Sequence, residues 1–215
     1  MNIEKKELLR YLGYKGQEYT PKLDSQIDKA IELCLSLITP RSVIKKFALR
    51  KDPLSLVGAD MKLLGDNIAK HLSGCEEIYI MGATVGFEVE KRVSHLMSSD
   101  PLAAVLLDSA SICAIESYCD DLCEELQAAN ATALTSRFSC GYGDFPLYQQ
   151  KDFVRVLELP KRIGVFMNEE SFMLSPQKTV TAVVGIKKYG KPNKTRCMMK
   201  CVGCENKECV YRSES

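Results

Sequence analysis

The sequence lacks a strong net charge of either sign. It has 29 lysine and arginine residues against 28 aspartate and glutamate residues, which leaves a formal net charge of +1. It also lacks a long basic run interleaved with aromatic residues, which is the usual mark of a nucleic-acid-binding chain. We therefore expect no nucleic-acid partner.

Long hydrophobic runs are also missing, since no stretch approaches the length that a membrane span needs. The N-terminus, Met1 to Glu7, alternates acidic and basic residues and has no apolar segment behind it, unlike a secretion signal. These two absences predict a cytoplasmic protein without a membrane partner.

Residues typical of common catalytic sites are scarce. The only histidines, His71 and His95, each stand alone on a helical pattern, where packing or surface roles are expected. The Gly82–Gly86 segment follows a predicted strand but lacks the lysine and serine of a phosphate-binding loop, so it is predicted to be a tightly packed connection. The sequence names no catalytic residue.

What is present suits one globular unit with an appendage. The chain has 215 residues, 46% of them hydrophobic and 27% charged, which is enough for a single core. We expect an α+β domain over 1–190, whose part up to about residue 76 is largely helical, and a cysteine-rich tail over 191–215. Periodicity predicts helices at 3–12, 23–38, 60–72, 101–127 and 149–157, and strands at 42–49, 77–81, 162–166 and 179–186. A further helix, carrying Val89, Val93 and Leu96, is predicted after Gly86.

The longest predicted helix begins at Asp100-Pro101, which combines a capping residue with a proline at the first helical position. Apolar residues recur along it at three- and four-residue steps and form one buried stripe. Glu116 lies on that stripe, and a buried carboxylate needs a partner.

A second informative stretch is Arg137-Phe138-Ser139-Cys140-Gly141-Tyr142. Its guanidinium offers a planar fork for a carboxylate, its glycine lets the backbone approach closely, and its tyrosine supplies an aromatic face. The same letters also suit an ordinary turn. Glu116 has two possible roles: a core ion pair with Arg137, or contact with a ligand ammonium while Arg137 binds the ligand carboxylate.

Several stretches of this sequence resemble a known family, the activation (reactivation) domain of cobalamin-dependent methionine synthase. The opening Tyr11–Gly16 is similar to the free-standing members of that family. The resemblance spans about residues 77 to 186 and rests on four stretches in the family's order: Met81–Phe87, Ala114–Ser117, Arg137–Tyr142, and Glu170–Pro176 followed by Thr179–Ala182.

The resemblance implies a twisted, mixed or antiparallel sheet flanked by helices and a site for S-adenosylmethionine. Arg137 and Tyr142 would contact this ligand, the backbone of Phe138, Ser139, Cys140 and Gly141 would line its site, and Glu116 matches the family's acidic ligand-binding residue. The chain departs from the family at Val184, where the best-known members carry a second tyrosine.

By the same resemblance, the protein would present a methyl group to the cobalamin of a separate methionine synthase and rescue inactive cob(II)alamin by reductive methylation. A flavodoxin-like or ferredoxin-like protein would donate the electron. Such a protein contributes positioning and electrostatics, and is not a catalyst without its partner. An activator of another corrinoid methyltransferase fits equally well.

The tail carries four cysteines with the spacing C-x3-C-x2-C-x4-C, namely Cys197, Cys201, Cys204 and Cys209. Four thiolates this close are typical of a zinc site or an iron-sulfur cluster, and a cluster would be suited to relay the electron. The other six cysteines are scattered and are expected to pack in the core, with Cys140 near the ligand.

Two alternatives remain from the sequence. The first three tail cysteines have the spacing of radical S-adenosylmethionine enzymes, but only six residues follow Cys209, where those enzymes continue into a long barrel segment. The second alternative is a metal-stabilised, non-catalytic interaction module whose pocket has lost its function, which the change to Val184 permits.

Overall fold

The computed structural model describes residues 1–130 and 132–188, which form an α+β fold around an antiparallel sheet. Within this part of the chain the sheet has the strand order β2-β1-β3-β6. In its register, Thr84 pairs with Arg41 on one side and with Thr179 on the other. The predicted fold class is confirmed, with every strand pair antiparallel. The strands are β1 (Arg41–Lys51), β2 (Leu54–Leu56), β3 (Cys75–Thr84) and β6 (Thr179–Lys187).

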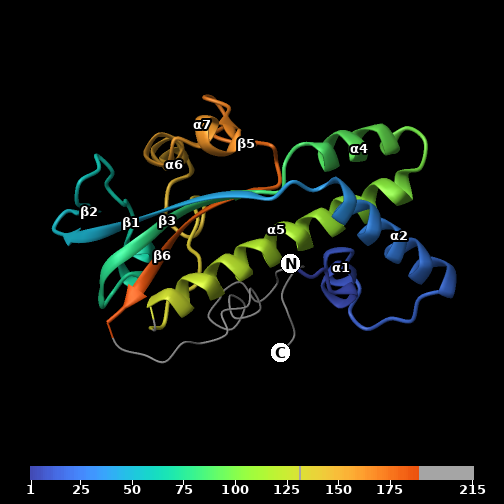
Figure 1. Ribbon diagram of the computed structural model, residues 1–215, viewed down its shortest axis with the longest axis horizontal. Helices are drawn as coiled ribbons and strands as arrows, with labels where there is room; N and C mark the ends of the chain where they lie inside the picture. The colour runs from blue at the N-terminus through green and yellow to red at the C-terminus, as the bar shows by residue number, and fades with distance from the viewer. Residues whose placement is uncertain (131, 189–215) are drawn as a thin grey trace.

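Helices cover both faces of this sheet, as Figure 1 shows. The long helix α5 (Pro101–Asn130) lies along one face, and α1 (Lys5–Tyr11), α2 (Pro21–Leu37) and α4 (Glu88–Met97) pack against it. The other face is covered by α3 (Asp66–His71), the 3-10 turn η1 (Leu147–Gln149), α6 (Gln150–Leu157) and α7 (Leu159–Ile163). Beyond α7, β4 (Phe166–Met167) pairs with β5 (Leu174–Ser175).

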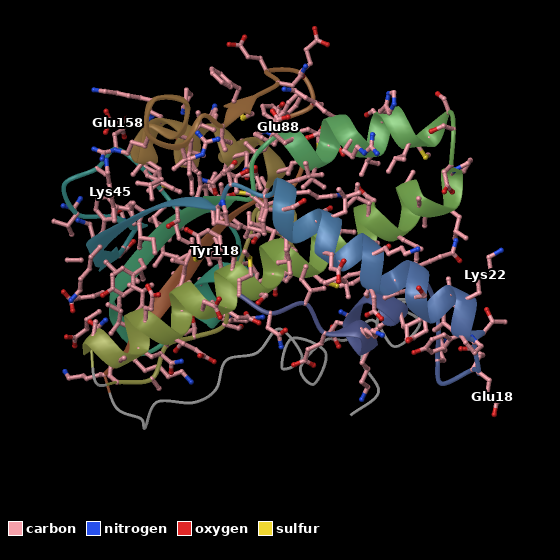
Figure 2. The ribbon with its side chains drawn as sticks, turned by 45° about the vertical axis from the view of Figure 1, so that its right-hand side comes forward. Glu18, Lys22, Lys45, Glu88, Tyr118 and Glu158 are labelled. Atoms are coloured by element: carbon pink, nitrogen blue, oxygen red, sulfur yellow. The ribbon has the colours of Figure 1, made fainter. Side chains whose placement is uncertain are left out.

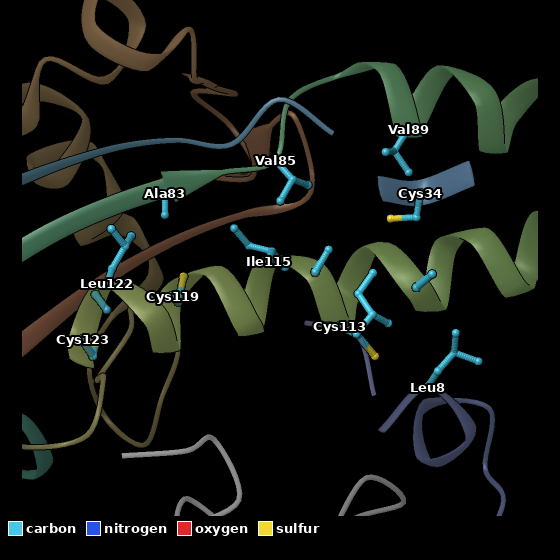
Figure 3. Close-up of a cluster of buried hydrophobic side chains, with 14 of the residues drawn as sticks. Leu8, Cys34, Ala83, Val85, Val89, Cys113, Ile115, Cys119, Leu122 and Cys123 are labelled. Carbon is cyan, nitrogen blue, oxygen red and sulfur yellow. The ribbon is translucent and has the colours of Figure 1, made fainter. Parts of the chain in front are cut away.

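Helix α5 begins as its sequence predicts. The Asp100 carboxylate accepts a hydrogen bond of 3.0 Å from the Ala103 amide, and Pro101 takes the first helical position. Figure 3 shows Ile115 and Leu122 of this helix pointing toward the sheet. Burial of this apolar stripe, together with the inward-facing residues of β3 and β6, makes α5 the centre of the larger core.

By length and composition alone, α5 is long and apolar enough to cross a membrane, contrary to the expectation from the sequence. However, 56% of its most apolar 18-residue stretch is buried inside the protein. Its apolar residues are therefore accounted for by packing against the sheet and the neighbouring helices.

Polar contacts tie β1 to the layers on both sides of the sheet. The Tyr118 hydroxyl of α5 donates a hydrogen bond of 3.0 Å to Ser42, and the Lys45 ammonium lies 3.5 Å from the Glu158 carboxylate beside α7. Figure 2 labels Tyr118, Lys45 and Glu158. Residues 42 and 45 point to opposite faces because side chains alternate along a strand.

The sequence mispredicted three elements. Helix α3 covers only Asp66–His71, and the expected strand over 162–166 is instead the end of helix α7, an irregular turn and the first residue of β4. That helix is short because Glu158 before it and Gly164 after it both take the left-handed conformation. Strand β3 does not turn at Gly82 but continues to Thr84, and the glycine is needed for close packing: a Cβ there would lie 2.7 Å from Leu159.

Candidate functional site

The segment that carries Arg137 lies beside β6. Two isolated bridges join Leu134 to Ile186 and Phe138 to Val183, and Phe138 both donates to and accepts from the Val183 backbone at 2.9 Å. Neighbouring residues of an extended segment point in opposite directions. Phe138 therefore packs in the core beneath α6, while Arg137 points toward α5.

Arg137 is held by two carboxylates of α5. Its Nη2 lies 2.6 Å from Glu116 Oε2 and its Nη1 lies 2.5 Å from Asp120 Oδ1. Glu116 and Asp120 are four residues apart, so both project from the same face of the helix. The Arg137 side chain is only 3% exposed, against 24% for Glu116 and 19% for Asp120. One buried cation is thus shared by two partly exposed carboxylates.

These carboxylates keep the guanidinium charged despite its burial. Burial alone would lower the pKa of Arg137, but the negative charges of Glu116 and Asp120 outweigh that effect and leave the pKa above its ordinary value. The Arg137 Nε has no hydrogen-bond partner among the described residues. Of the two roles considered for Glu116, the structure shows the ion pair with Arg137; a contact between Arg137 and a ligand carboxylate remains a prediction.

A cavity of about 240 Å³ opens on one side of Glu116. The residues from the arginine motif that line it are Ser139, Cys140 and Tyr142, whereas Arg137 lies behind Glu116 and Phe138 faces the core. Glu116 is the one charged residue among the described residues that line it. Its remaining walls are Leu147, Gln150, Phe172, Met173, Leu174, Gln177, Thr179, Val180 and Thr181.

The loop over this cavity is shaped by Gly141. This glycine has a φ of +88°, a conformation that favours glycine, and its amide donates to the Phe145 carbonyl at 2.8 Å. The turn leaves Tyr142 44% exposed at the cavity, with its ring edge-on to Phe138 at 5.9 Å. The Asp144 carboxylate then accepts from the Asp66 and Asn67 amides at 2.6 and 3.0 Å and fixes the loop to α3.

Cys140 lines the cavity but is not a reactive thiolate. Burial raises the pKa of its thiol to about 12, so the group is protonated at neutral pH. The sulfur supplies a soft, apolar wall. Each of the six cysteines in the described ranges is buried and unbridged, as their scattered spacing predicted.

Several site residues were missed by the sequence analysis. Asp120 follows Glu116 by one helical turn, and this spacing was a usable signal. Gln150 and Thr181 form a buried amide–hydroxyl pair at 2.8 Å on the cavity floor. They come from α6 and β6, 31 residues apart, and no local pattern joins them.

A second cavity, of about 200 Å³, lies on the other side of Glu116, between the N-terminal segment and α5. Its lining is strongly acidic: Glu4, Glu7, Glu116, Asp120, Asp121 and Glu124. Four of these carboxylates are paired with described cations: Glu116 and Asp120 with Arg137, Asp121 with the N-terminal amine at 2.7 Å, and Glu7 with Arg10 at 2.8 Å. Glu116 is therefore a wall between two cavities.

The proposed metal ligands Cys197, Cys201, Cys204 and Cys209 lie outside the described residues. Within residues 1–130 and 132–188, no group of three or more histidine, cysteine, aspartate or glutamate side chains is arranged to hold a metal ion. The zinc or iron-sulfur site therefore remains a prediction from cysteine spacing.

The fold is similar to that of a solved structure. The chain superimposes on a crystal structure described as the MetH reactivation domain bound to AdoHcy (S-adenosylhomocysteine), with a TM-score of 0.61 over 86% of this chain and 78% of that one. It has the reactivation-domain fold. Sequence identity between the two is 13%, and no protein-family model or curated protein matches the sequence.

The reactivation-domain fold makes the position of Val184 informative. This residue is fully buried on β6, where it pairs with Tyr79 and packs in the core beneath α5. It does not line the cavity; Thr179, Val180 and Thr181 of the same strand do. The departure that the sequence comparison places at Val184 is thus predicted at a core position of this chain, not at the cavity wall.

Proposed function

We propose that the protein binds S-adenosylmethionine in the cavity beside Glu116 and presents its methyl group to the cobalamin of a separate methionine synthase. The observation that carries the proposal is the meeting of Glu116 with Ser139, Cys140 and Tyr142 around one cavity. It is supported by a fold similar to that of a reactivation domain whose crystal structure holds AdoHcy.

The cavity suits the chemistry of this ligand. Glu116 offers a negative charge to the sulfonium or ammonium, Tyr142 and Phe172 offer aromatic faces, and Gln150 and Thr181 offer polar groups. At about 240 Å³ the cavity is smaller than the ~300 Å³ and more of typical ligand pockets. Part of the ligand would remain at the mouth, where a methyl group must lie if a docked partner is to receive it.

In the proposed reaction, one electron from a flavodoxin-like or ferredoxin-like donor and one methyl group from the ligand are added to the partner's cob(II)alamin. The S–CH3 bond breaks with its electron pair staying on sulfur, which leaves neutral S-adenosylhomocysteine, and the reduced cobalt supplies the pair of the new bond. This chain supplies binding and orientation, while reduction alone is uphill and is pulled forward by the irreversible methylation.

The rim of the cavity gives the partner a surface to dock on. Tyr142, Leu147, Tyr148 and Met173 are between 41% and 60% exposed, and the Tyr148 and Phe172 rings lie 6.5 Å apart. An exposed apolar cluster around a binding cavity is typical of an interaction surface. A cytoplasmic location, and a metal on the tail cysteines that relays the electron, complete the proposal.

Reconstitution tests the function. The protein is mixed under anaerobic conditions with a cobalamin-loaded methionine synthase whose own activation region has been removed, together with reduced flavodoxin and S-adenosylmethionine. The proposal predicts loss of the cob(II)alamin absorption and formation of an equal amount of S-adenosylhomocysteine. Tyr142→Ala should slow both, while Arg162→Ala, which changes an exposed side chain of α7, should not. The experiment is repeated with a second corrinoid methyltransferase as the partner. If neither partner shows loss of cob(II)alamin absorption or formation of S-adenosylhomocysteine, the proposal is contradicted.

A further inference from the structure

We infer that the cavity selects its ligand by charge, favouring the cationic S-adenosylmethionine over the neutral product S-adenosylhomocysteine, and that Asp120 is the positioning residue that sets this preference through Arg137. The inference rests on the proposed function and names a specificity of the same site. Its physical basis is the division of one buried cation between two carboxylates.

The charges at the site favour a cation. Among the described residues, Glu116 is the one charged group that lines the cavity. The guanidinium behind it is 3% exposed and has both terminal nitrogens engaged, one by Glu116 and one by Asp120. Counted together, the three groups carry one positive and two negative charges, so the site bears an excess of negative charge despite the arginine.

Other described charges nearby do not reverse this sign. Lys178, next to the cavity residues Gln177 and Thr179, has its ammonium 2.8 Å from the Asp108 carboxylate of α5. On the far side of Glu116, the second cavity adds the carboxylates of Glu4, Glu7, Asp121 and Glu124, of which Glu7 is paired with Arg10 and Asp121 with the N-terminal amine. The carboxylates outnumber these two cations, so this side also contributes a negative potential at the first cavity.

Asp120 contributes without touching the ligand. It lines the second cavity but not the first, and its contact is with Arg137 Nη1 at 2.5 Å. If Asp120 loses its charge, the full positive charge of Arg137 opposes Glu116 alone. The negative potential at the ligand then weakens, although every cavity wall remains in place.

The two ligands isolate this effect. S-adenosylmethionine and S-adenosylhomocysteine share the adenosine, amino and carboxylate groups and differ by one methyl group and one positive charge on sulfur. The ratio of their dissociation constants therefore cancels the shared contacts. Sinefungin, in which a carbon bearing an ammonium replaces the methylated sulfur, keeps the charge without the S-methyl group and separates charge from methyl contact.

The test is calorimetric titration of the full chain with all three compounds. Wild type should bind S-adenosylmethionine and sinefungin at least about tenfold more tightly than S-adenosylhomocysteine, since unit charges near a protein surface interact strongly over a few ångström. Added salt should narrow the ratio. Asp120→Asn should reduce this affinity ratio by about threefold or more, because it should weaken binding of the two cationic ligands and leave the affinity for S-adenosylhomocysteine unchanged.

A matched control is Asp121→Asn, which removes the same charge from the next residue of α5, where the carboxylate is paired with the N-terminal amine and not with Arg137. This variant should leave the ratio closer to wild type than Asp120→Asn does. If Asp120→Asn does not fold, Glu116→Gln and the salt dependence of wild type test the same claim, because each should also narrow the ratio.

The outcomes separate the inference from the function on which it rests. Saturable binding of all three compounds with equal affinity would overturn the inference and leave the proposed function standing. An unchanged ratio in folded Asp120→Asn would also overturn it, and so would an unchanged ratio in Glu116→Gln. No binding of any of the three would overturn both.

Discussion

Arg137 reaches across the site to Glu116, with 2.6 Å between Nη2 and Oε2, so the arginine of the motif and the acidic residue of the helix meet directly. This pair joins the segment beside β6 to α5, and of its two members Glu116 lines the cavity while Arg137 lies behind it. Stability and ligand binding therefore both depend on this ion pair. For any variant of Arg137 or Glu116, both the free energy of unfolding and the ligand affinity must be measured.

Loss of the guanidinium should destabilise the fold. In Arg137→Ala, two partly buried carboxylates lose their cation. Breaking a buried pair in this way typically costs about 3 to 5 kcal/mol, and the partial exposure of both carboxylates places the expected loss at the lower end of that range. Urea denaturation followed by circular dichroism measures the change. Arg162→Ala, whose pair with Glu158 is about half exposed, should change the free energy of unfolding by less than about 0.5 kcal/mol. Equal effects of the two substitutions would contradict the assigned role.

His71 should make stability depend on pH. Burial lowers the pKa of its imidazole, although its hydrogen bond with the Ser136 carbonyl opposes the shift. A group with a lowered pKa in the folded state contributes stability above its unfolded pKa of about 6.5, and this contribution is lost as pH falls through the folded pKa. We expect the melting temperature to fall between pH 7 and pH 5, and His71→Gln to flatten that slope. An identical slope in the variant would show that the pH dependence arises elsewhere.

The cavity thiol should resist alkylation. Because burial raises the pKa of Cys140 to about 12, iodoacetamide at pH 8 should leave this cysteine unmodified in the native protein and modify it fully in urea. Cys113 and Cys119 behave alike, since burial raises each thiol pKa to about 12. Peptide mass spectrometry reads all three sites at once. Rapid native labelling of Cys140 alone would mean that the cavity wall is not closed over its sulfur.

Gly82 should tolerate no side chain. A Cβ at this position would lie 2.7 Å from Leu159 and 3.4 Å from Leu157, so Gly82→Ala overpacks the interface between β3 and the helices above it. We expect a loss of about 1 to 3 kcal/mol in the free energy of unfolding. The double variant Gly82→Ala with Leu159→Ala should recover part of that loss if the clash is its cause. No recovery would point to the strand backbone instead.

Much of the fold followed from local patterns in the sequence. The start of α5 was predictable because Asp100-Pro101 is a strong capping signal, and its buried face followed from apolar spacing. Strand β2 was missed because it has three residues, too few for alternation to show. Helix α7 was misread because its ends are set by left-handed backbone at Glu158 and Gly164, and a non-glycine residue in that conformation has no clear sequence signal.

The site was predictable only where residues are close in sequence or carry a known motif. Glu116 was identified because a carboxylate on an apolar stripe is unusual, and Tyr142 because of its motif. Gln150, Phe172 and Thr181 reach the same cavity through packing of α6 and the β4–β5 turn against β6. That packing depends on contacts between distant segments, which a single sequence does not display.

The central claim is that the cavity beside Glu116 binds S-adenosylmethionine, and calorimetric titration of anaerobically purified protein tests it most directly. We expect saturable one-to-one binding that weakens by about tenfold or more in Glu116→Gln and in Tyr142→Ala. The first variant removes the negative charge of the cavity, and the second removes an aromatic wall that would contact the ligand. Absence of binding by folded wild-type protein, or binding that both variants leave unchanged, would contradict the claim.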